Sequence, residues 1–119
     1  MNKFTPLSDS ELEVMEVLWD DPPMETARVH EILSGKKERA YTTVATFLIR
    51  MEEKGLLKSE KKGRAKLYSP TLSREDYRRA ETESFLASVH RGSKRSLLAA
   101  LCGGRLSPEE IDELAKLIE

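Results

Sequence analysis

One segment, residues 40–68, constrains the fold most strongly, because a helical pattern in it passes directly into an alternating one. Apolar side chains first recur at helical spacing, at Val44, Leu48 and Met51. Gly55 then suits the left-handed end of a helix. After it, Leu57, Ser59 and Lys61 alternate with the charged Lys58 and Glu60, and Lys62-Gly63 turns the chain into residues 64–68. The pattern predicts a helix over about residues 41–54, followed at once by a β-hairpin with a basic tip.

Two shorter helices are predicted before that segment. Ser8 and Glu11 have the spacing of a capping box, which marks the start of a helix. The apolar stripes of the two helices are expected to be Leu12, Met15, Leu18 and Trp19 in the first, and Val29, Ile32 and Leu33 in the second. Three short helices followed by a hairpin predict a mainly α fold, the winged helix-turn-helix with a β-hairpin wing. We assign this domain to residues 1–72.

Residues 73–119 contain helical patterns only. A serine marks each of three helix starts: Ser73, Ser93 and Ser107. The first of these helices is expected to run to Arg91, before Gly92. Three short amphipathic helices in so small a region need a partner surface to bury their apolar faces. Packing on the same chain is one solution, and exchange with a second copy is more economical. We therefore predict a C-terminal three-helix dimerisation region and a homodimer, with contacts from Tyr77, Phe85, Leu86, Val89, Leu97, Leu98, Leu101, Ile111, Leu114 and Ile118.

The formal net charge of −1 conceals a segregation of charge along the chain. Residues 36–79 contain thirteen basic and six acidic side chains, a balance of +7. Residues 1–35 hold two basic against eight acidic side chains, and residues 80–119 hold five against seven. A basic segment inside an otherwise acidic chain is the pattern expected of one anion-binding surface.

The helix over residues 41–54 carries three threonines in its first two turns, each costing about a few tenths of a kcal/mol relative to alanine. Their clustering is explained if they face the major groove of a double-stranded DNA operator, because threonine can contact base edges, phosphates and the thymine methyl. The candidate DNA-binding residues of this helix are Thr42, Thr43, Thr46 and Arg50. The candidates on the wing, suited to sequence-independent phosphate contact, are Lys61, Lys62, Arg64 and Lys66.

Several other functions lack support in the residues. A single cysteine, Cys102, leaves no disulfide framework or cysteine-rich zinc site, and His30 and His90 have no carboxylate or cysteine at ligand spacing. No enzyme or cofactor motif is present, so we expect no catalysis, no bound cofactor and no metal. The chain has no apolar run of about 18 residues and no signal-peptide core, so we expect no membrane insertion and a cytoplasmic location.

Three segments, in this order and spacing, carry a resemblance to a known family: LSDSELEVMEVLW, AYTTVATFLIRMEEKGLL and GRAKLYSPTLSREDYRRAETESFL. The chain resembles the penicillinase repressor (BlaI/MecI/CopY) family of bacterial transcription factors across nearly its whole length. The resemblance implies a homodimer that represses genes by occupying a palindromic operator, often with TACA/TGTA half-sites. By matching position, it also implies operator contacts by Thr42, Thr43, Thr46 and Arg50.

Two branches of that family differ in how repression is relieved. The antibiotic-resistance branch implies a partner pathway in which a membrane sensor protease leads to cleavage of the repressor at an Asn-Phe bond. In this chain Ala100-Leu101 stands at that position, which departs from the pattern. The copper-responsive branch has paired Cys-x-Cys motifs near the carboxyl terminus, and this sequence has none, so copper is not the expected signal.

Two alternatives to a dimeric sequence-specific repressor stay open. A ligand-sensing winged helix of the multiple-antibiotic-resistance regulator type would need an apolar pocket with a polar anchor between its domains. A winged helix used as a protein-interaction module would need an apolar or acidic surface on the third helix and the wing. The +7 balance of residues 36–79 favours the repressor over the interaction module.

Overall fold

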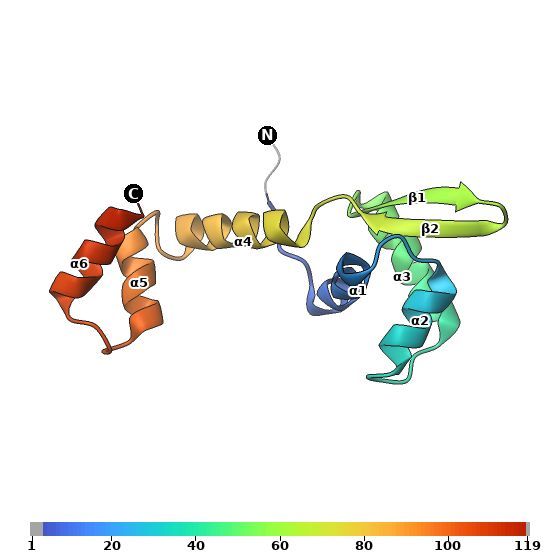
Figure 1. Cartoon of the computed structure of the whole chain (residues 1–119), viewed down its shortest axis with the longest axis horizontal. Helices are drawn as coiled ribbons and strands as arrows, with labels where there is room; N and C mark the ends of the chain where they lie inside the picture. The colour runs from blue at the N-terminus through green and yellow to red at the C-terminus, as the bar shows by residue number, and fades with distance from the viewer. Residues whose placement is uncertain (1–3, 119) are drawn as a thin grey trace. The chain divides into compact units, whose positions relative to one another are not determined.

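The computed structural model describes residues 4–118, in the order of three helices, two strands and three further helices (Figure 1). The elements are α1 (Asp9–Asp20), α2 (Thr26–Ser34), α3 (Tyr41–Glu53), β1 (Leu57–Lys62), β2 (Ala65–Pro70), α4 (Arg74–Ser88), α5 (Lys94–Cys102) and α6 (Pro108–Leu117). A mainly helical chain with one antiparallel hairpin confirms the predicted fold class. Among these residues, no helix combines the length and the apolar character needed to cross a membrane.

The described chain divides into two compact units: Thr5–Tyr77 form one, and the residues from Arg78 onward, with Phe4, form the other. The first unit, which we call the winged-helix unit, contains α1, α2, α3, the hairpin and the first turn of α4. The second, the helical unit, contains the rest of α4 together with α5 and α6.

A single apolar core holds the winged-helix unit together. The buried residues of α2 and α3 lie on the predicted stripes, except that Ile32 is only partly buried. Tyr68 of β2 belongs to the same core and exchanges two backbone hydrogen bonds with Met24, of 2.8 and 3.0 Å. The core consists of Val14, Met15, Val17, Leu18, Met24, Val29, Leu33, Val44, Leu48, Met51, Leu57 and Tyr68.

The buried face of α1 differs from the predicted stripe. Leu12 and Trp19 remain partly exposed, and Val14 and Val17 are buried instead. The indole of Trp19 has a polar edge that needs an acceptor, and its Nε1 donates to the carbonyl oxygen of Leu72 at 2.8 Å. Trp19 therefore sits at the rim of the core rather than inside it.

The capping box at the start of α1 is present as predicted. The hydroxyl of Ser8 accepts from the backbone N–H of Glu11 at 3.2 Å, and the Glu11 carboxylate accepts from the N–H of Ser8 at 2.9 Å. The other carboxylate oxygen of Glu11 accepts from Nζ of Lys54 at 2.9 Å. One buried carboxylate thus starts α1 and also holds the residue that ends α3.

The hairpin turn falls one residue later than predicted. Strands β1 and β2 pair in a register that places Lys61 opposite Lys66, and the turn consists of Gly63 and Arg64 rather than Lys62-Gly63. Gly63 has a φ of +64°, which the first position of a type II′ hairpin turn requires and glycine adopts without strain.

In the helical unit, α4 ends at Ser88, three residues before the predicted end at Arg91. Arg91 and Gly92 have φ values of +52° and +81°, a left-handed conformation that cannot continue a right-handed helix. The start of α5 is capped by Ser93, whose hydroxyl accepts from the backbone N–H of Ser96 at 3.1 Å.

Helices α5 and α6 pack against each other, and α6 begins with the predicted capping box of Ser107 and Glu110. Within residues 78–118, however, only Ile111 and Ala115 are buried. The helical unit therefore has very little apolar core of its own.

Candidate nucleic-acid interface

The two sides of α3 have opposite character. Val44, Leu48 and Met51 are buried in the core. The four side chains predicted as DNA contacts are all exposed and, together with Phe47, line one shallow hollow of about 290 Å³. We call this set the threonine face: Thr42, Thr43, Thr46 and Arg50. The structure therefore brings these residues together on one solvent-facing surface.

The threonine face presents donors, acceptors and methyl groups on one helix. Each hydroxyl can donate and accept a hydrogen bond, and a guanidinium offers five donors in a fixed plane. Among residues 4–118, the side chain of Arg50 has no ion-pair or hydrogen-bond partner. An uncompensated guanidinium beside three hydroxyls suits a ligand that is both anionic and rich in hydrogen-bonding groups.

The tip of the wing is basic and has no charge partner within the described chain. Lys61, Lys62 and Arg64 are exposed, and their side chains make no ion pair or hydrogen bond with any residue from 4 to 118. Their charge is therefore open to an external anion.

Lys66 lies in a different environment from the other wing candidates. Its Nζ is 2.9 Å from Oε1 of Glu52 on α3 and 5.0 Å from the centre of the Tyr68 ring. Glu52 also accepts a hydrogen bond from the hydroxyl of Ser59 on β1. Both donors lower the pKa of Glu52, first Ser59 and then Lys66, and the bond to Glu52 is the main cause that raises the pKa of Lys66. The charge of Lys66 is largely compensated, and the contact fastens the wing to α3.

Acidic side chains of α1 neutralise part of the +7 segment. Four ion pairs join α1 to basic residues that come later in the chain: Arg39 with Glu13 at 2.6 Å, Lys54 with Glu11 at 2.9 Å, and Arg74 with both Glu16 at 2.9 Å and Asp20 at 2.8 Å. Part of the positive charge of the segment is therefore compensated within the chain rather than open to an external anion. In the described chain, the exposed cations of the segment without such a partner are Lys36, Lys37, Arg50, Lys58, Lys61, Lys62, Arg64 and Arg78.

The turn between α2 and α3 is fixed at Arg39. Its guanidinium pairs with Glu13, which lowers the pKa of that carboxyl. The backbone carbonyl of Arg39 lies 2.7 Å from Nε2 of His30, and because a carbonyl can only accept, Nε2 carries the proton. His30 thus has a local structural contact. Within the described residues, no three side chains of the metal-binding types converge on one site.

Ile49 belongs beside the threonine face, although the sequence analysis did not select it. Its side chain is 48% exposed, and it follows Thr42 by seven residues and Thr46 by three, which places it on the same side of α3. An exposed isoleucine there can contact a thymine methyl in the major groove. The signal in the sequence was an apolar residue outside the buried stripe of Val44, Leu48 and Met51.

Tyr77 is the one predicted dimer residue that lies in the winged-helix unit. Its hydroxyl accepts from the backbone N–H of Leu7 at 2.9 Å, and its ring lies 5.7 Å from the ring of Trp19. With only 6% of its surface exposed, Tyr77 has almost no surface available for contact with a second chain. Its packing is therefore internal.

The other nine predicted dimer residues lie in the helical unit and differ in exposure. Ile111 of α6 is buried, and Leu86, Leu97 and Leu98 are partly buried. The remaining five are exposed in the single chain: Phe85, Val89, Leu101, Leu114 and Ile118.

A helical core, an exposed polar face on the third helix and a basic hairpin directly after it define a winged helix-turn-helix protein. The chain belongs to the penicillinase repressor family, whose family model, described as penicillinase repressor, matches residues 7–119. The predicted resemblance is thereby confirmed.

Two curated relatives and one solved structure illustrate the similarity. The chain is 37% identical to the penicillinase repressor of Bacillus licheniformis, over 100% of this chain and 94% of that protein. It is 33% identical to the transcriptional regulator BlaI of Mycobacterium tuberculosis, over 99% of this chain and 86% of the other. The solution structure of monomeric Bacillus licheniformis BlaI in complex with the blaP half-operator matches with a TM-score of 0.55 and 38% identity, covering 65% of this chain and 94% of that one.

Proposed function

We propose that this chain is a sequence-specific DNA-binding transcriptional repressor that acts as a homodimer on a palindromic operator. The observation that carries the proposal is the joint exposure, in one winged-helix unit, of the threonine face and an uncompensated basic wing tip. The similarity to BlaI, solved in complex with a half-operator, supports DNA as the partner.

In this proposal, α3 lies in the major groove, whose width admits a helix. The threonines contact base edges and phosphates, and Arg50 reaches a base or a phosphate oxygen. Ile49 adds an apolar contact with a thymine methyl. These contacts supply the preference for one sequence over another.

The wing has a different task. Lys61, Lys62 and Arg64 contact phosphate oxygens and supply affinity that does not depend on sequence. Lys66 holds the wing in place through Glu52 instead of contacting phosphate itself. This role for Lys66 departs from its selection as a phosphate contact in the sequence analysis.

Dimerisation is proposed for the helical unit. Its helices expose large apolar side chains, among them Val89 at 61% and Leu101 at 70%. A second copy of the chain would cover these side chains, and a two-fold axis would present two winged-helix units to two half-sites.

The first experiment is a selection of random DNA duplexes with the purified chain, followed by titration of the selected duplex, a TACA/TGTA palindrome and a shuffled duplex. Each titration is repeated at several salt concentrations, and the stoichiometry is measured by light scattering. We expect tight binding to the selected duplex, two chains per duplex and a steep loss of affinity with salt.

Failure of the selection to enrich any sequence, with weak binding to all duplexes even at low salt, would overturn the proposal and favour a protein-interaction module. Enrichment of a single half-site bound by one chain would retain sequence-specific DNA binding and reject the dimer.

A further inference from the structure

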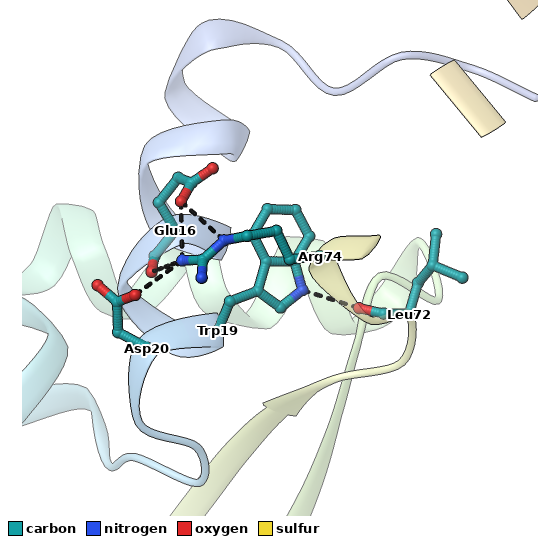
Figure 2. Close-up of polar contacts among 5 residues, drawn as sticks. All are labelled: Glu16, Trp19, Asp20, Leu72 and Arg74. Carbon is teal, nitrogen blue, oxygen red and sulfur yellow. Dashed lines mark hydrogen bonds and ion pairs between the residues drawn. The ribbon is translucent and has the colours of Figure 1, made fainter. Parts of the chain in front are cut away.

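The first turn of α4 is fastened to α1 by a cluster that we call the α4 anchor, consisting of Glu16, Trp19, Asp20, Leu72 and Arg74 (Figure 2). All five residues lie in the winged-helix unit. None belongs to the threonine face or the wing, so the proposed DNA contacts leave the cluster unexplained.

Arg74 makes most of the contacts in the anchor. Its Nη2 lies 2.9 Å from Oε2 of Glu16, 3.3 Å from the Glu16 carbonyl oxygen and 2.8 Å from Oδ1 of Asp20. Its Nε lies 3.2 Å from the same Glu16 carboxylate oxygen, and its guanidinium carbon lies 5.6 Å from the centre of the Trp19 ring. The guanidinium is thus held in both position and orientation, which the single ammonium of lysine could not match.

Two further contacts flank the guanidinium. Nε1 of Trp19 donates to the carbonyl oxygen of Leu72, two residues before α4 begins (Figure 2). One turn into α4, the Tyr77 hydroxyl accepts from the N–H of Leu7. The first turn of α4 is therefore restrained before, at and after Arg74.

The exposure of the anchor argues against a purely stabilising role. The side chains of Arg74, Glu16 and Asp20 are 30%, 42% and 71% exposed, and ion pairs with this much solvent contact add little to stability. A network that restrains orientation through several bonds at one guanidinium is better suited to positioning than to raising the free energy of unfolding.

The position of the anchor in the chain indicates what it positions, namely helix α4. Helix α4 is uninterrupted from Arg74 to Ser88, and it begins in the winged-helix unit and continues in the helical unit. In a continuous helix each turn continues the axis of the turn before it, so a restraint on the first turn of α4 also restrains the turns that follow.

We propose that Arg74 is a positioning residue that makes the dimer selective for the separation of its two half-sites, an inference that rests on the proposed dimeric DNA binding. In B-DNA, each inserted base pair moves one half-site by about 3.4 Å and rotates it by about 34° around the helix axis. A dimer with restrained α4 helices loses affinity after such a change, because it cannot bind both half-sites at once. A dimer in which the first turns of α4 are free can still reach the displaced half-site and loses less affinity.

The test uses the full chain and the duplex selected by the wild-type protein from a random library. Affinity is measured for that duplex, for versions with one or two base pairs inserted or deleted between the half-sites, and for a duplex with one half-site. For the wild type we expect a loss of about tenfold or more per altered spacing, because misplaced sites cannot be engaged together.

The variants are Arg74→Gln and, acting on the same anchor through a different bond, Trp19→Phe, which removes the indole donor to Leu72 but keeps a ring. We expect either one to reduce the loss to about threefold or less and to leave affinity for a single half-site within about twofold of wild type. Arg74→Lys, which keeps the charge without the planar fork, should restore selectivity only in part.

Arg78→Gln is the matched control. It removes the same charge one turn further along α4, and the Arg78 side chain has no hydrogen bond or ion pair with residues 4–118. Its spacing profile should equal that of the wild type. Circular dichroism verifies that each variant is folded, and if Arg74→Gln does not fold, Trp19→Phe decides.

A wild type that selects a two-half-site duplex but binds all spacings equally would overturn the inference while leaving the proposed function intact. So would a folded anchor variant with the spacing selectivity of the wild type. If the wild type selects no duplex at all, the proposed function fails, and the inference fails with it.

Discussion

Nζ of Lys66 on the wing and Oε1 of Glu52 on α3 lie 2.9 Å apart, so the hairpin is fastened to the helix that presents the threonine face. Directly across the hairpin, Lys61 faces Lys66 in the strand register but has no acidic partner in the described chain. The two lysines therefore differ in whether an acidic side chain compensates their charge, and this difference can be measured through the salt dependence of DNA binding.

Lys62→Ala should lower the slope of the logarithm of DNA affinity against the logarithm of salt concentration by about one unit, because one phosphate contact is lost. Lys66→Ala should change the slope by less than half as much, because Glu52 already compensates that ammonium. Titration of one duplex at four salt concentrations measures both slopes. Equal changes would mean that Lys66 leaves Glu52 to bind phosphate.

Thr46→Ala should weaken binding to the selected duplex by about 1–3 kcal/mol and leave binding to a shuffled duplex nearly unchanged, because base contacts carry the discrimination. Competition titrations with the two duplexes measure the difference. Thr82→Ala is the matched control, since the Thr82 hydroxyl donates to the Arg78 carbonyl within α4 and lies outside the interface. Equal losses on both duplexes would remove the assigned role of Thr46.

Val89→Glu combined with Leu101→Glu should convert the proposed dimer into a folded monomer at micromolar concentration. Both side chains are exposed in the single chain, so the monomer tolerates the charges, whereas a dimer interface would bury them without partners. Size-exclusion chromatography with light scattering measures the mass. Ile49→Glu, an apolar position exposed to 48% on the winged-helix unit, should leave the dimer intact. A dimeric double variant would place the interface elsewhere.

Acid should destabilise the winged-helix unit in part through Glu11. Burial raises the pKa of this carboxyl, but hydrogen bonds from the Ser8 backbone, Lys54 and the Ser8 hydroxyl together hold it below its ordinary value of 4.5. A carboxyl whose pKa is lower in the folded chain than in the unfolded chain stabilises the folded state at pH values above its unfolded pKa. That stabilisation is lost as the pH falls through its folded pKa.

The free energy of unfolding should therefore be nearly level above about pH 5 and decline below 4.5. Glu11→Gln, which keeps an acceptor for the Ser8 N–H but has no charge for Lys54, should differ most from the wild type at pH 7 and least at low pH. Urea unfolding at pH 7 and pH 3.5 measures this difference. If the free energies of unfolding of the two proteins differed by the same amount at pH 7 and at pH 3.5, the charge of Glu11 would contribute nothing to stability.

Elements with local signals could be predicted from the sequence. The buried stripe of α3 and the capping boxes at Ser8 and Ser107 depend on residues within one or two turns, and the structure contains all of them. The predicted hairpin turn lies one residue before the observed one. Its position depends on pairing between the strands, and the alternating pattern of each strand alone does not determine that register.

The contacts between distant segments could not be predicted. Periodicity treats Trp19 and Tyr77 as apolar, whereas the polar atom of each bonds to a distant segment: Trp19, at the rim of the core, donates to Leu72, and the buried Tyr77 accepts from Leu7. The compensation of Lys66 by Glu52 depends on how the wing folds back toward α3, which no local pattern encodes. For that reason Lys66 was predicted to resemble Lys61, Lys62 and Arg64, whose charges are uncompensated in the described chain.

The bond between Glu11 and Lys54 has an evolutionary consequence. The Glu11 side chain, 11% exposed, contacts the first turn of α1 and also Lys54, the C-cap residue of α3, so loss of either partner leaves a nearly buried charge or an unrestrained helix end. Across relatives of this chain, positions 11 and 54 should therefore covary: changes at one should be accompanied by compensating changes at the other.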